Sequence, residues 1–398
     1  EYIQYSELYE FMKRNLINPM ENHVFSEVSN DVLQKKFIAV ARPSLPTAEY
    51  ILPYLQQIDQ NHWYSNQGPL HNTFQERLGA LWGIETGRIV LVTSATTGLS
   101  LALQAHNVAH GKYCLMPSWT FVATAAAVVN AGLKPHFLDV CPKTWSLDPS
   151  YVEYLAERRD IGAILVVVPF GAPLELAEWD DVAEHTGCPV IIDAAAAFDT
   201  LRSDGPMRPQ KSTVVVSLHA TKVFGVGEGG AVIARDPIAA ERIRALTRFG
   251  FSGGRIAHYS GINAKISEYT AAVGLASLDC WAITRAKWNR VTELYKNYLP
   301  STVTLPPNFG SSWVSSTLTV LCSVNSSALQ NYFSKHQVET VLWWGYGCHD
   351  QPAYTAYTRE ALPITRDYAQ RSVGLPFWLG IEEESIQYIC NVIFNYLE

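Results

Sequence analysis

The segment TVVVSLHATKVFGVGEGGAVIA, residues 213–234, places two short apolar runs on either side of a glycine-rich loop. The runs at 213–217 and 231–234 are rich in β-branched residues, which is typical of strands. The loop between them is too short for a full crossover helix, so we expect the second strand to be antiparallel or irregularly connected. The one lysine of the loop, Lys222, follows the first run by five residues.

Five similar runs precede this segment, and helix-length segments separate most of them. They are RIVLV (88–92), YCLM (113–116), HFLDV (136–140), AILVVV (163–168) and PVIID (189–193). Strands that alternate with helices predict a parallel sheet covered on both faces. We therefore expect a large, doubly wound α/β domain over residues 41–265, with a mostly parallel, seven-stranded sheet.

The pattern changes after residue 265. A long helical segment (266–299) is followed by mixed short strands and helices, which predicts a smaller α+β domain over residues 266–398. Residues 1–40 fit neither pattern, and we treat them as an N-terminal extension without an assigned role. Two domains with a cleft between them form the simplest architecture for this sequence.

Composition excludes several classes of protein. The chain has 398 residues, 48% of them hydrophobic, which is enough for a large globular core. Lys and Arg number 30 against 37 Asp and Glu, and they form no basic run, so we expect no nucleic-acid partner. The longest uncharged stretch (113–133) contains Pro117 and Asn130 with several hydroxyl residues, so we expect no membrane span.

The cysteines and the first residues of the chain bear on its location. The seven cysteines are scattered and form no C-x-x-C pair, which favours free thiols over a disulfide framework or a metal site. The first residues are polar and mixed in charge, without the apolar segment of a secretory signal. We therefore expect a cytoplasmic protein without a bound metal.

Polar residues that follow the strands are the candidates for chemistry, because ligands of open α/β sheets bind beyond the carboxyl ends of the strands. In VTSATTGLSLAL, Ala95 and Thr96 begin a helix whose free backbone N–H groups fit a phosphate. Alternatively, Ser94 or Thr96 only caps that helix. In MPSWTFVATAAAV, Trp119 has the plane to stack on a flat cofactor, although an indole is more often part of a core.

Two further residues carry charge at strand ends. Asp193 ends the run PVIID and is suited to hold a protonated ring nitrogen, or alternatively to cap a helix formed by AAAA. Lys222 is suited to desolvation and imine formation, although a lysine in such a loop is usually solvated. A phosphate anchor, an aromatic plane, a carboxylate and a lysine are together the parts that hold pyridoxal phosphate (PLP).

These segments resemble the sugar aminotransferase family often called DegT or StrS, a branch of the fold-type I PLP enzymes. The resemblance runs from about residue 41 to 389. It rests on QGPLHNTF, SATTGLSLAL, MPSWTFVATAAAV, KPHFLDVCPKTWSLDP, IIDAAAAFD, SLHATKVFGVGEGGAV, GINAKISEYTAAVGLASL and CHDQPAY. Among these, S-x-H-A-T-K-x-x-x-x-G-E-G-G is highly specific.

The resemblance implies a role for each candidate residue. Lys222 would form the Schiff base with the cofactor, Asp193 would bind the pyridine nitrogen and Trp119 would stack on the ring. The phosphate would bind to the backbone of Ala95 and Thr96 and to the hydroxyl of Ser217. Asn263 would reach the phosphate of the neighbouring subunit, which implies an obligate homodimer. The family commonly has Gln, near the cofactor's phenolic oxygen, where this chain has Ala196, so this chain departs from the family at that contact.

The resemblance also implies a reaction. Glutamate would donate an amino group to a keto carbon of a nucleotide-diphospho keto sugar, in deoxysugar biosynthesis of the kind that supplies lipopolysaccharide O-antigen. The segments NHWYSNQGPL, DAAAAFD and GINAKISE favour C4 of dTDP-4-keto-6-deoxyglucose, giving dTDP-4-amino-4,6-dideoxyglucose. Lys265 and His349 are candidate contacts to the substrate, or else a solvated lysine and a structural histidine.

Two alternatives to this reaction stay open. The first is an aminotransferase of the same family that acts on a 3-keto or another nucleotide sugar. The second is a non-catalytic binding or regulatory protein on the same fold, which the combination of Lys222 with Asp193 disfavours. Some relatives have His in place of the lysine and are dehydratases, and the presence of Lys222 disfavours that branch too.

Overall fold

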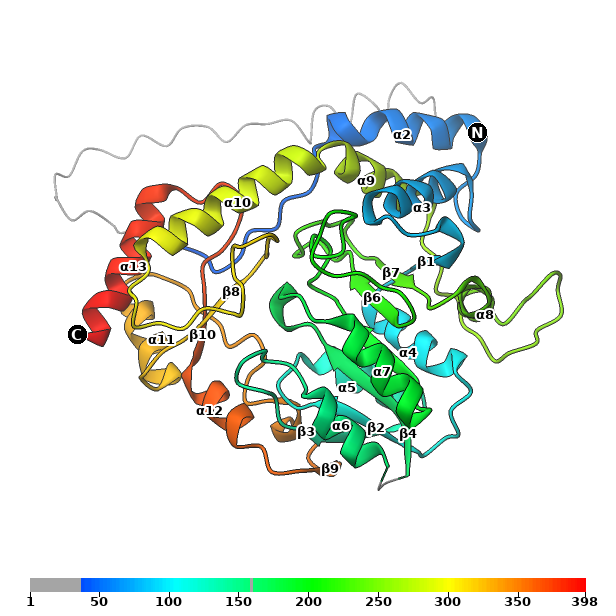
Figure 1. The fold of residues 1–398 in the computed structure, drawn as a ribbon. Helices are drawn as coiled ribbons and strands as arrows, with labels where there is room; N and C mark the ends of the chain where they lie inside the picture. The colour runs from blue at the N-terminus through cyan, green and yellow to red at the C-terminus, as the bar shows by residue number, and fades with distance from the viewer. Residues whose placement is uncertain (1–36, 158–159) are drawn as a thin grey trace, which may run out of the picture. The chain divides into compact units, whose positions relative to one another are not determined.

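A computed structural model of the chain describes residues 37–157 and 160–398. The predicted N-terminal extension over residues 1–40 falls outside the described residues up to residue 36. The described residues form a large sheet that lies among helices (Figure 1).

The large sheet has the strand order β1-β7-β6-β5-β4-β2-β3-β9. Its strands are β1 (Ile89–Val92), β2 (Tyr113–Pro117), β3 (Lys134–Leu138), β4 (Ile161–Val167), β5 (Val190–Asp193), β6 (Thr213–Ser217), β7 (Gly230–Ile233) and β9 (Thr358–Arg359). All seven predicted runs form strands of this sheet. The eighth strand, β9, was missed because it has only two residues, both exposed, and carries no apolar pattern.

The direction of the strands agrees with the prediction. The four pairs β3–β2, β2–β4, β4–β5 and β5–β6 are parallel, and β9 pairs in parallel with β3. β7 pairs antiparallel with both β1 and β6. The short Gly-rich loop before β7 therefore returns the chain directly beside β6, as its length required.

Helices cover both faces of the large sheet. Alternate strand residues, such as Leu115 and Ile164 against Cys114 and Leu165, belong to two different apolar cores. The first core also contains residues of α3 (Pro69–Trp82), α6 (Pro149–Ala156) and α7 (Leu176–Thr186). The second contains residues of α4 (Ala95–Ala105), α5 (Val122–Asn130) and α8 (Pro237–Leu246). This is the doubly wound arrangement that the sequence predicted.

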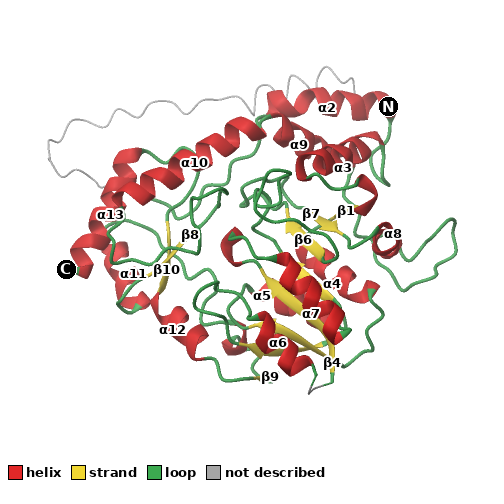
Figure 2. Cartoon of the chain, viewed as in Figure 1, coloured by secondary structure: helices red, strands yellow, loops and turns green. Residues whose placement is uncertain are grey.

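The remaining elements lie mainly in the C-terminal part. They are α2 (Ala48–Asn61), α9 (Glu268–Asp279), α10 (Trp281–Tyr298), α11 (Ser326–Lys335), α12 (Pro363–Arg371) and α13 (Glu383–Leu397), with short 3-10 helices at Thr86–Arg88, Pro169–Gly171 and Cys348–Asp350. A second, antiparallel sheet pairs β8 (Leu318–Leu321) with β10 (Ser372–Leu375) (Figure 2). The predicted domain boundary at residue 265 stays a prediction.

Three observations concern the described residues. No helix among the described residues is both long and apolar enough to cross a membrane. All seven cysteines are free thiols. Within 37–157 and 160–398, no group of three or more His, Cys, Asp or Glu side chains is arranged to hold a metal ion.

Candidate active site

Asp193 ends β5, between β4 and β6, and its side chain is buried. The Thr124 hydroxyl donates to Asp193 Oδ2 at 2.8 Å, and the Ala195 N–H donates to Oδ1 at 3.2 Å. Burial raises the pKa of Asp193, while these two hydrogen bonds and the charge of Lys222 oppose the rise. The AAAA segment that follows forms turns and no helix, so the alternative of a helix cap at Asp193 was wrong.

Lys222 lies in a loop whose backbone is fixed at several points. The Ala220 N–H donates to the Gly227 carbonyl at 2.8 Å, and Gly227 adopts a φ of 95° that favours glycine. The Trp288 indole donates to the Val223 carbonyl at 3.1 Å, which ties the loop to α10.

The surroundings of the Lys222 amine make it a better nucleophile. Burial lowers the pKa of Lys222, and the charge of Asp193 partly offsets this effect. Each group therefore lies within electrostatic reach of the other, with Asp193 at the end of β5 and Lys222 in the loop that follows the neighbouring strand β6. A lowered pKa raises the fraction of neutral amine at neutral pH, which is the form that attacks a carbonyl.

A candidate phosphate cradle lies where β1 and β6 end and β7 begins. Strand register pairs Gly230 with Val92 on one side and with Ser217 on the other. A Cβ at Gly230 would lie 2.7 Å from the Ala95 backbone nitrogen, so only glycine lets this nitrogen and β7 come so close. The cradle would then be bounded by the start of α4 on one side and by Ser217 on the other.

The start of α4 has both a capping residue and free backbone N–H groups, so it fits the helix-cap interpretation and the phosphate interpretation of its sequence. Ser94 is the N-cap, and its hydroxyl oxygen accepts the Thr97 N–H at 3.1 Å. The N–H groups of Ala95 and Thr96 precede the first intrahelical hydrogen bonds, and the helix supplies no acceptor for them. A helix N-terminus with free N–H groups and a partial positive charge favours a phosphate.

The aromatic residues of the turn after β2 differ in exposure. Trp119 is only 1% exposed and packs edge to face against Trp344 and Tyr368, at centroid distances of 5.3 and 6.1 Å. Trp119 is therefore part of an aromatic core, and its stacking on a cofactor stays a prediction. Phe121, two residues later and directly before α5, is 55% exposed. Phe121 is the second aromatic of PSWTF, and the sequence pattern did not single it out.

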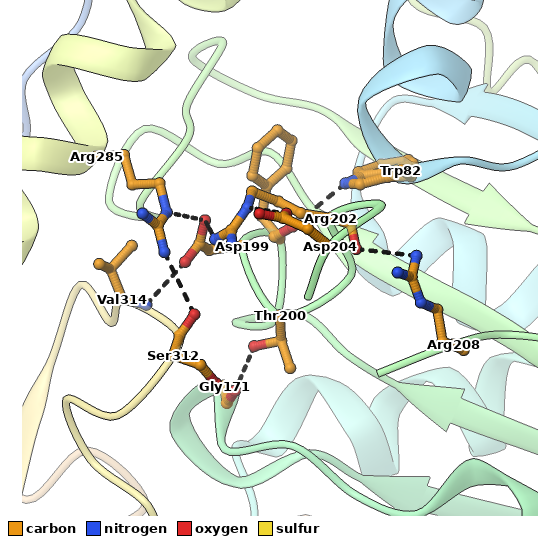
Figure 3. A network of polar contacts seen from close by, with 11 residues as sticks. Trp82, Gly171, Asp199, Thr200, Arg202, Asp204, Arg208, Arg285, Ser312 and Val314 are labelled. Carbon is orange, nitrogen blue, oxygen red and sulfur yellow. Dashed lines mark hydrogen bonds and ion pairs between the residues drawn. The ribbon is translucent and has the colours of Figure 1, made fainter. Parts of the chain in front are cut away.

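The segment after Asp193 is held by a polar network (Figure 3). Asp199 is fully buried, and its Oδ1 lies 2.6 Å from Arg202 Nη1 and 2.8 Å from Arg285 Nε. Its Oδ2 accepts the Val314 N–H at 3.0 Å. The Thr200 hydroxyl donates to the Gly171 carbonyl at 2.7 Å. The turn that follows the carboxylate of β5 is therefore fixed to α10 and to the loop after β4.

Two of the remaining predicted residues come together. Asn263 is exposed, and the Lys265 ammonium donates to its side-chain oxygen. Lys265 Nζ also lies 5.4 Å from the centroid of the Phe249 ring. Burial and the nearby charge of Arg248 lower the pKa of Lys265.

His349 has little contact with solvent. The residue is only 3% exposed, and its Nδ1 lies 2.7 Å from the Ser118 hydroxyl oxygen. This geometry favours the structural interpretation of His349, which fastens the segment around it to the turn after β2. Ala196 contributes no polar side chain, so the family's usual contact at this place has no counterpart there.

The described groups fit the chemistry of the predicted cofactor. A buried carboxylate within reach of a desolvated amine suits a pyridinium nitrogen and a carbonyl carbon, and the start of α4 suits a phosphate. The tight approach at Gly230 is the clearest geometric sign, because any larger residue would fill the place beside the Ala95 nitrogen.

Comparisons with known proteins agree with this fit. The sequence profile of the DegT/DnrJ/EryC1/StrS aminotransferase family matches residues 47–394. Two relatives are named dTDP-4-amino-4,6-dideoxy-D-glucose transaminase. The relative from Shigella dysenteriae is 38% identical over 62% of this chain and 65% of its own length. The relative from Escherichia coli is 29% identical over 91% of this chain and 100% of its own.

Solved structures give the same result. A protein from Bacillus cereus, described as a PLP-dependent aminotransferase, has a TM-score of 0.84 and 30% identity, over 90% of this chain and 100% of its own. The structure of DesI, solved with its TDP-sugar product, has a TM-score of 0.81 and 29% identity, over 90% of this chain and 92% of the other.

Proposed function

Because this chain belongs to the DegT/DnrJ/EryC1/StrS aminotransferase family, we propose that it moves an amino group from glutamate to a nucleotide-linked keto-deoxysugar. The chain is a PLP-dependent enzyme of fold type I, like its solved relatives. The proposed acceptor is C4 of dTDP-4-keto-6-deoxyglucose, and the product is dTDP-4-amino-4,6-dideoxyglucose. The names of the Shigella and Escherichia relatives and the TDP-sugar in DesI support this choice.

The observation that carries the proposal is that two buried charged groups, the Asp193 carboxylate at the end of β5 and the Lys222 amine in the loop after β6, lie within electrostatic reach of each other. Bound PLP supplies an electron sink for the carbon that bears the amino group. Asp193 would hold a proton on the ring nitrogen, which strengthens that sink. Lys222 would bind the cofactor covalently and, once displaced by the donor, move the proton from Cα of glutamate to C4′ of the cofactor.

The other residues would bind and orient. Backbone N–H groups of Ala95 and Thr96 and the Ser217 hydroxyl would bind the phosphate on either side of Gly230. For the ring face we propose two candidates, Trp119 as implied by the resemblance and Phe121 because of its exposed ring. Either ring would cover one face of the cofactor and limit the access of water to it.

We further propose that the enzyme is a homodimer in which Asn263 serves the partner's active site. Exposed Asn263 lies on a segment that carries several exposed apolar side chains and pairs with the backbone around Phe249. Phe249, Ile256, Tyr259 and Ile262 are 50%, 71%, 37% and 50% exposed. Large exposed apolar patches commonly mark protein interfaces. Such an interface would bury this surface and bring Asn263 to a second subunit.

Lys265, which contacts Asn263, is the proposed partner for the diphosphate of the sugar nucleotide. The cationic side chain of Arg248 adds to the positive potential there, as its effect on the pKa of Lys265 indicates. For His349 we propose a positioning role, since its ring is buried against Ser118. A cytoplasmic location and an O-antigen pathway are consistent with this function and stay predictions.

The proposal is tested in two half-reactions. With PLP, the purified protein should show a visible absorbance band that glutamate converts to the pyridoxamine form. Lys222→Ala should abolish the conversion. A wild-type protein that binds no PLP, or whose spectrum glutamate leaves unchanged, would contradict the cofactor or the donor respectively.

The second half-reaction identifies the acceptor. Incubation with dTDP-4-keto-6-deoxyglucose should restore the original spectrum and yield a sugar whose new amine is found at C4 by NMR. Turnover of a 3-keto sugar in its place would favour the alternative acceptor within the family. Turnover of neither, despite a working first half-reaction, would exclude both sugars.

The shared site has its own test. Lys222→Ala and Asn263→Ala proteins should each be inactive alone, because one lacks the reacting amine and the other a proposed phosphate contact. Mixed and allowed to exchange subunits, they should regain part of the activity, since one site of each mixed dimer is intact. No recovery despite proven exchange would contradict a shared site.

A further inference from the structure

A buried chain of two hydroxyl groups ends on the Asp193 carboxylate. Thr124, in the first turn of α5, donates from Oγ1 to Asp193 Oδ2 at 2.8 Å. Thr120 Oγ1 lies 2.8 Å from Thr124 Oγ1, and both residues are almost completely buried. An ionised carboxylate has no proton to give, so Thr124 must donate to it. The oxygen of Thr124 then accepts the proton of Thr120, and the direction of both hydrogen bonds is fixed.

The two oxygens of Asp193 each have one donor from the protein. Thr124 donates to Oδ2 and the Ala195 N–H to Oδ1. Each carboxylate oxygen can accept two hydrogen bonds, so a further acceptor position stays available for a ligand N–H. The Thr124 hydrogen bond is the strongest of the contributions that keep the pKa of Asp193 from rising further on burial.

We propose that Thr124 is a positioning residue of the cofactor site, which holds Asp193 ionised and correctly turned toward the cofactor's ring nitrogen. Thr120 acts through Thr124 by fixing the direction of its hydroxyl. The inference rests on the proposed placement of the PLP ring against Asp193. It adds two residues, one on α5 and one in the turn before it, that neither the sequence patterns nor the comparisons pointed to.

The topology explains why a side chain from α5 is needed. α5 follows β2, and β4 separates β2 from β5 in the sheet. Neighbouring strands lie about 4.8 Å apart, so the end of β2 is roughly 10 Å from Asp193 and beyond direct hydrogen-bond reach. A threonine on the first turn of the helix spans this gap. Its β-branched side chain also has few rotamers, so its hydroxyl is held in one direction at little further entropic cost.

The turn that carries Thr120 is itself fastened from its other side. The Cys348 N–H donates to the Ser118 carbonyl at 2.8 Å, and the Cys348 thiol to the Thr120 carbonyl at 3.4 Å. The Ser118 hydroxyl contacts His349 Nδ1 at 2.7 Å. These contacts hold the 118–120 turn in place, so loss of one hydroxyl cannot be repaired by a shift of the turn toward Asp193.

The test compares four variants. Thr124→Val removes the hydroxyl at nearly constant volume, and Thr124→Ser retains it. Thr120→Val removes the second hydroxyl only. Thr292→Val is the matched control, because Thr292 is equally buried and its hydroxyl donates only to the Trp288 carbonyl within α10. The readout is the dissociation constant of PLP for the apo-protein across pH, together with kcat and KM.

We expect Thr124→Val to weaken PLP binding about 10- to 100-fold, the range for one hydrogen bond to a charged group. Because the pKa of Asp193 should rise, the loss of affinity on acidification should begin at higher pH. Thr124→Ser should restore both properties, and Thr120→Val should weaken binding by about threefold, as for a neutral hydrogen bond. Thr292→Val should bind PLP like the wild type.

The outcomes separate this inference from the proposed function. Wild-type PLP affinity and an unshifted pH profile in Thr124→Val would overturn the positioning role while leaving the enzyme's function intact. Weakening that is uniform across pH would also overturn it, because a purely structural effect has no reason to depend on the protonation of Asp193. If Thr124→Val does not fold, Thr120→Val decides, and wild-type affinity there would overturn the inference. Absence of PLP binding in the wild type would instead refute the function itself.

Discussion

Replacement of Asp199 by Asn should destabilise the protein through the network that follows β5. Asp199 is fully buried and is the common acceptor for Arg202, Arg285 and the Val314 N–H, as Figure 3 shows. Asn has the same shape but no charge, and its amide group donates where the carboxylate accepts. At least one of the three donors would then face another donor in a site closed to water.

The size of the expected loss of stability depends on how far Arg202 and Arg285 are exposed to solvent. Removing one member of a buried ion pair costs about 3–5 kcal/mol when the other charge cannot reach water. Here the Arg285 side chain is 26% exposed and can turn partly to solvent, and Arg202 keeps its ion pair with Asp204 at 2.9 Å. We therefore expect a loss of about 2–4 kcal/mol in the free energy of unfolding. For a chain of 398 residues this lowers the melting temperature by about 2–5 °C.

The assay pairs Asp199→Asn with Asp204→Asn, measured by thermal and urea unfolding. Both carboxylates contact Arg202, but the Asp204 side chain is 77% exposed, so its removal should leave the midpoint close to that of the wild type. A double-mutant cycle with Arg285→Ala should give a coupling energy above about 1 kcal/mol for the pair with Asp199. Equal stability of the two Asp variants would refute the reasoning.

Three further predictions concern pH, the phosphate cradle and the aromatic turn. Burial and nearby arginines lower the pKa of His106 to about 4 in the folded state, below its unfolded value of about 6.5. Below about pH 6.5 the unfolded state therefore binds a proton that the folded state does not. Acidification should lower the free energy of unfolding, by about 1–2 kcal/mol at pH ~5, and above about pH 6.5 this loss is absent. His106→Asn should remove that part of the pH dependence. The free energy of unfolding, measured with urea at several pH values, would contradict this if it changed equally with pH in the wild type and the variant. Gly230→Ala should weaken PLP binding about tenfold or more, because its Cβ would lie 2.7 Å from the Ala95 nitrogen, whereas Gly254→Ala meets nothing within 4 Å and should not. If Phe121 stacks on the cofactor, Phe121→Ala should shift the visible spectrum and raise the dissociation constant of PLP more than Trp119→Leu does, and the reverse order would favour Trp119.

The strands of the large sheet could be predicted because they are buried on both faces. Runs such as AILVVV and PVIID are continuously apolar, which is the signature of a strand covered by helices on two sides. From loop length alone, β7 was predicted to be antiparallel or irregularly connected, and it is antiparallel. β9 could not be predicted, since two exposed residues pair with β3 only because the chain after the Cys348–Asp350 helix returns to the edge of the sheet.

The candidate site could be predicted only where a residue's role depends on its place along a strand. Asp193 and Ser217 are the last residues of β5 and β6, and Lys222 lies in the loop after β6, so all three lie toward one edge of the sheet. The contacts of Thr124 could not be predicted, because a threonine in an alanine-rich helix carries no sign of which strand end it faces. The burial of Trp119 depends in turn on Trp344, which lies more than 200 residues away in the chain.

Helix α10 links the two charged groups of the site more closely than the sheet alone does. Arg285 and Trp288 are three residues apart and share one face of this helix. Arg285 binds Asp199 in the turn after Asp193, and Trp288 donates to the Val223 carbonyl beside Lys222. One face of a single helix therefore holds both segments, although they leave different strands of the sheet. A rigid helix then helps to fix the separation of the Asp193 carboxylate and the Lys222 amine. The proposed cofactor requires a fixed separation, because its ring nitrogen and its carbonyl carbon, which these two groups would bind, are themselves a fixed distance apart.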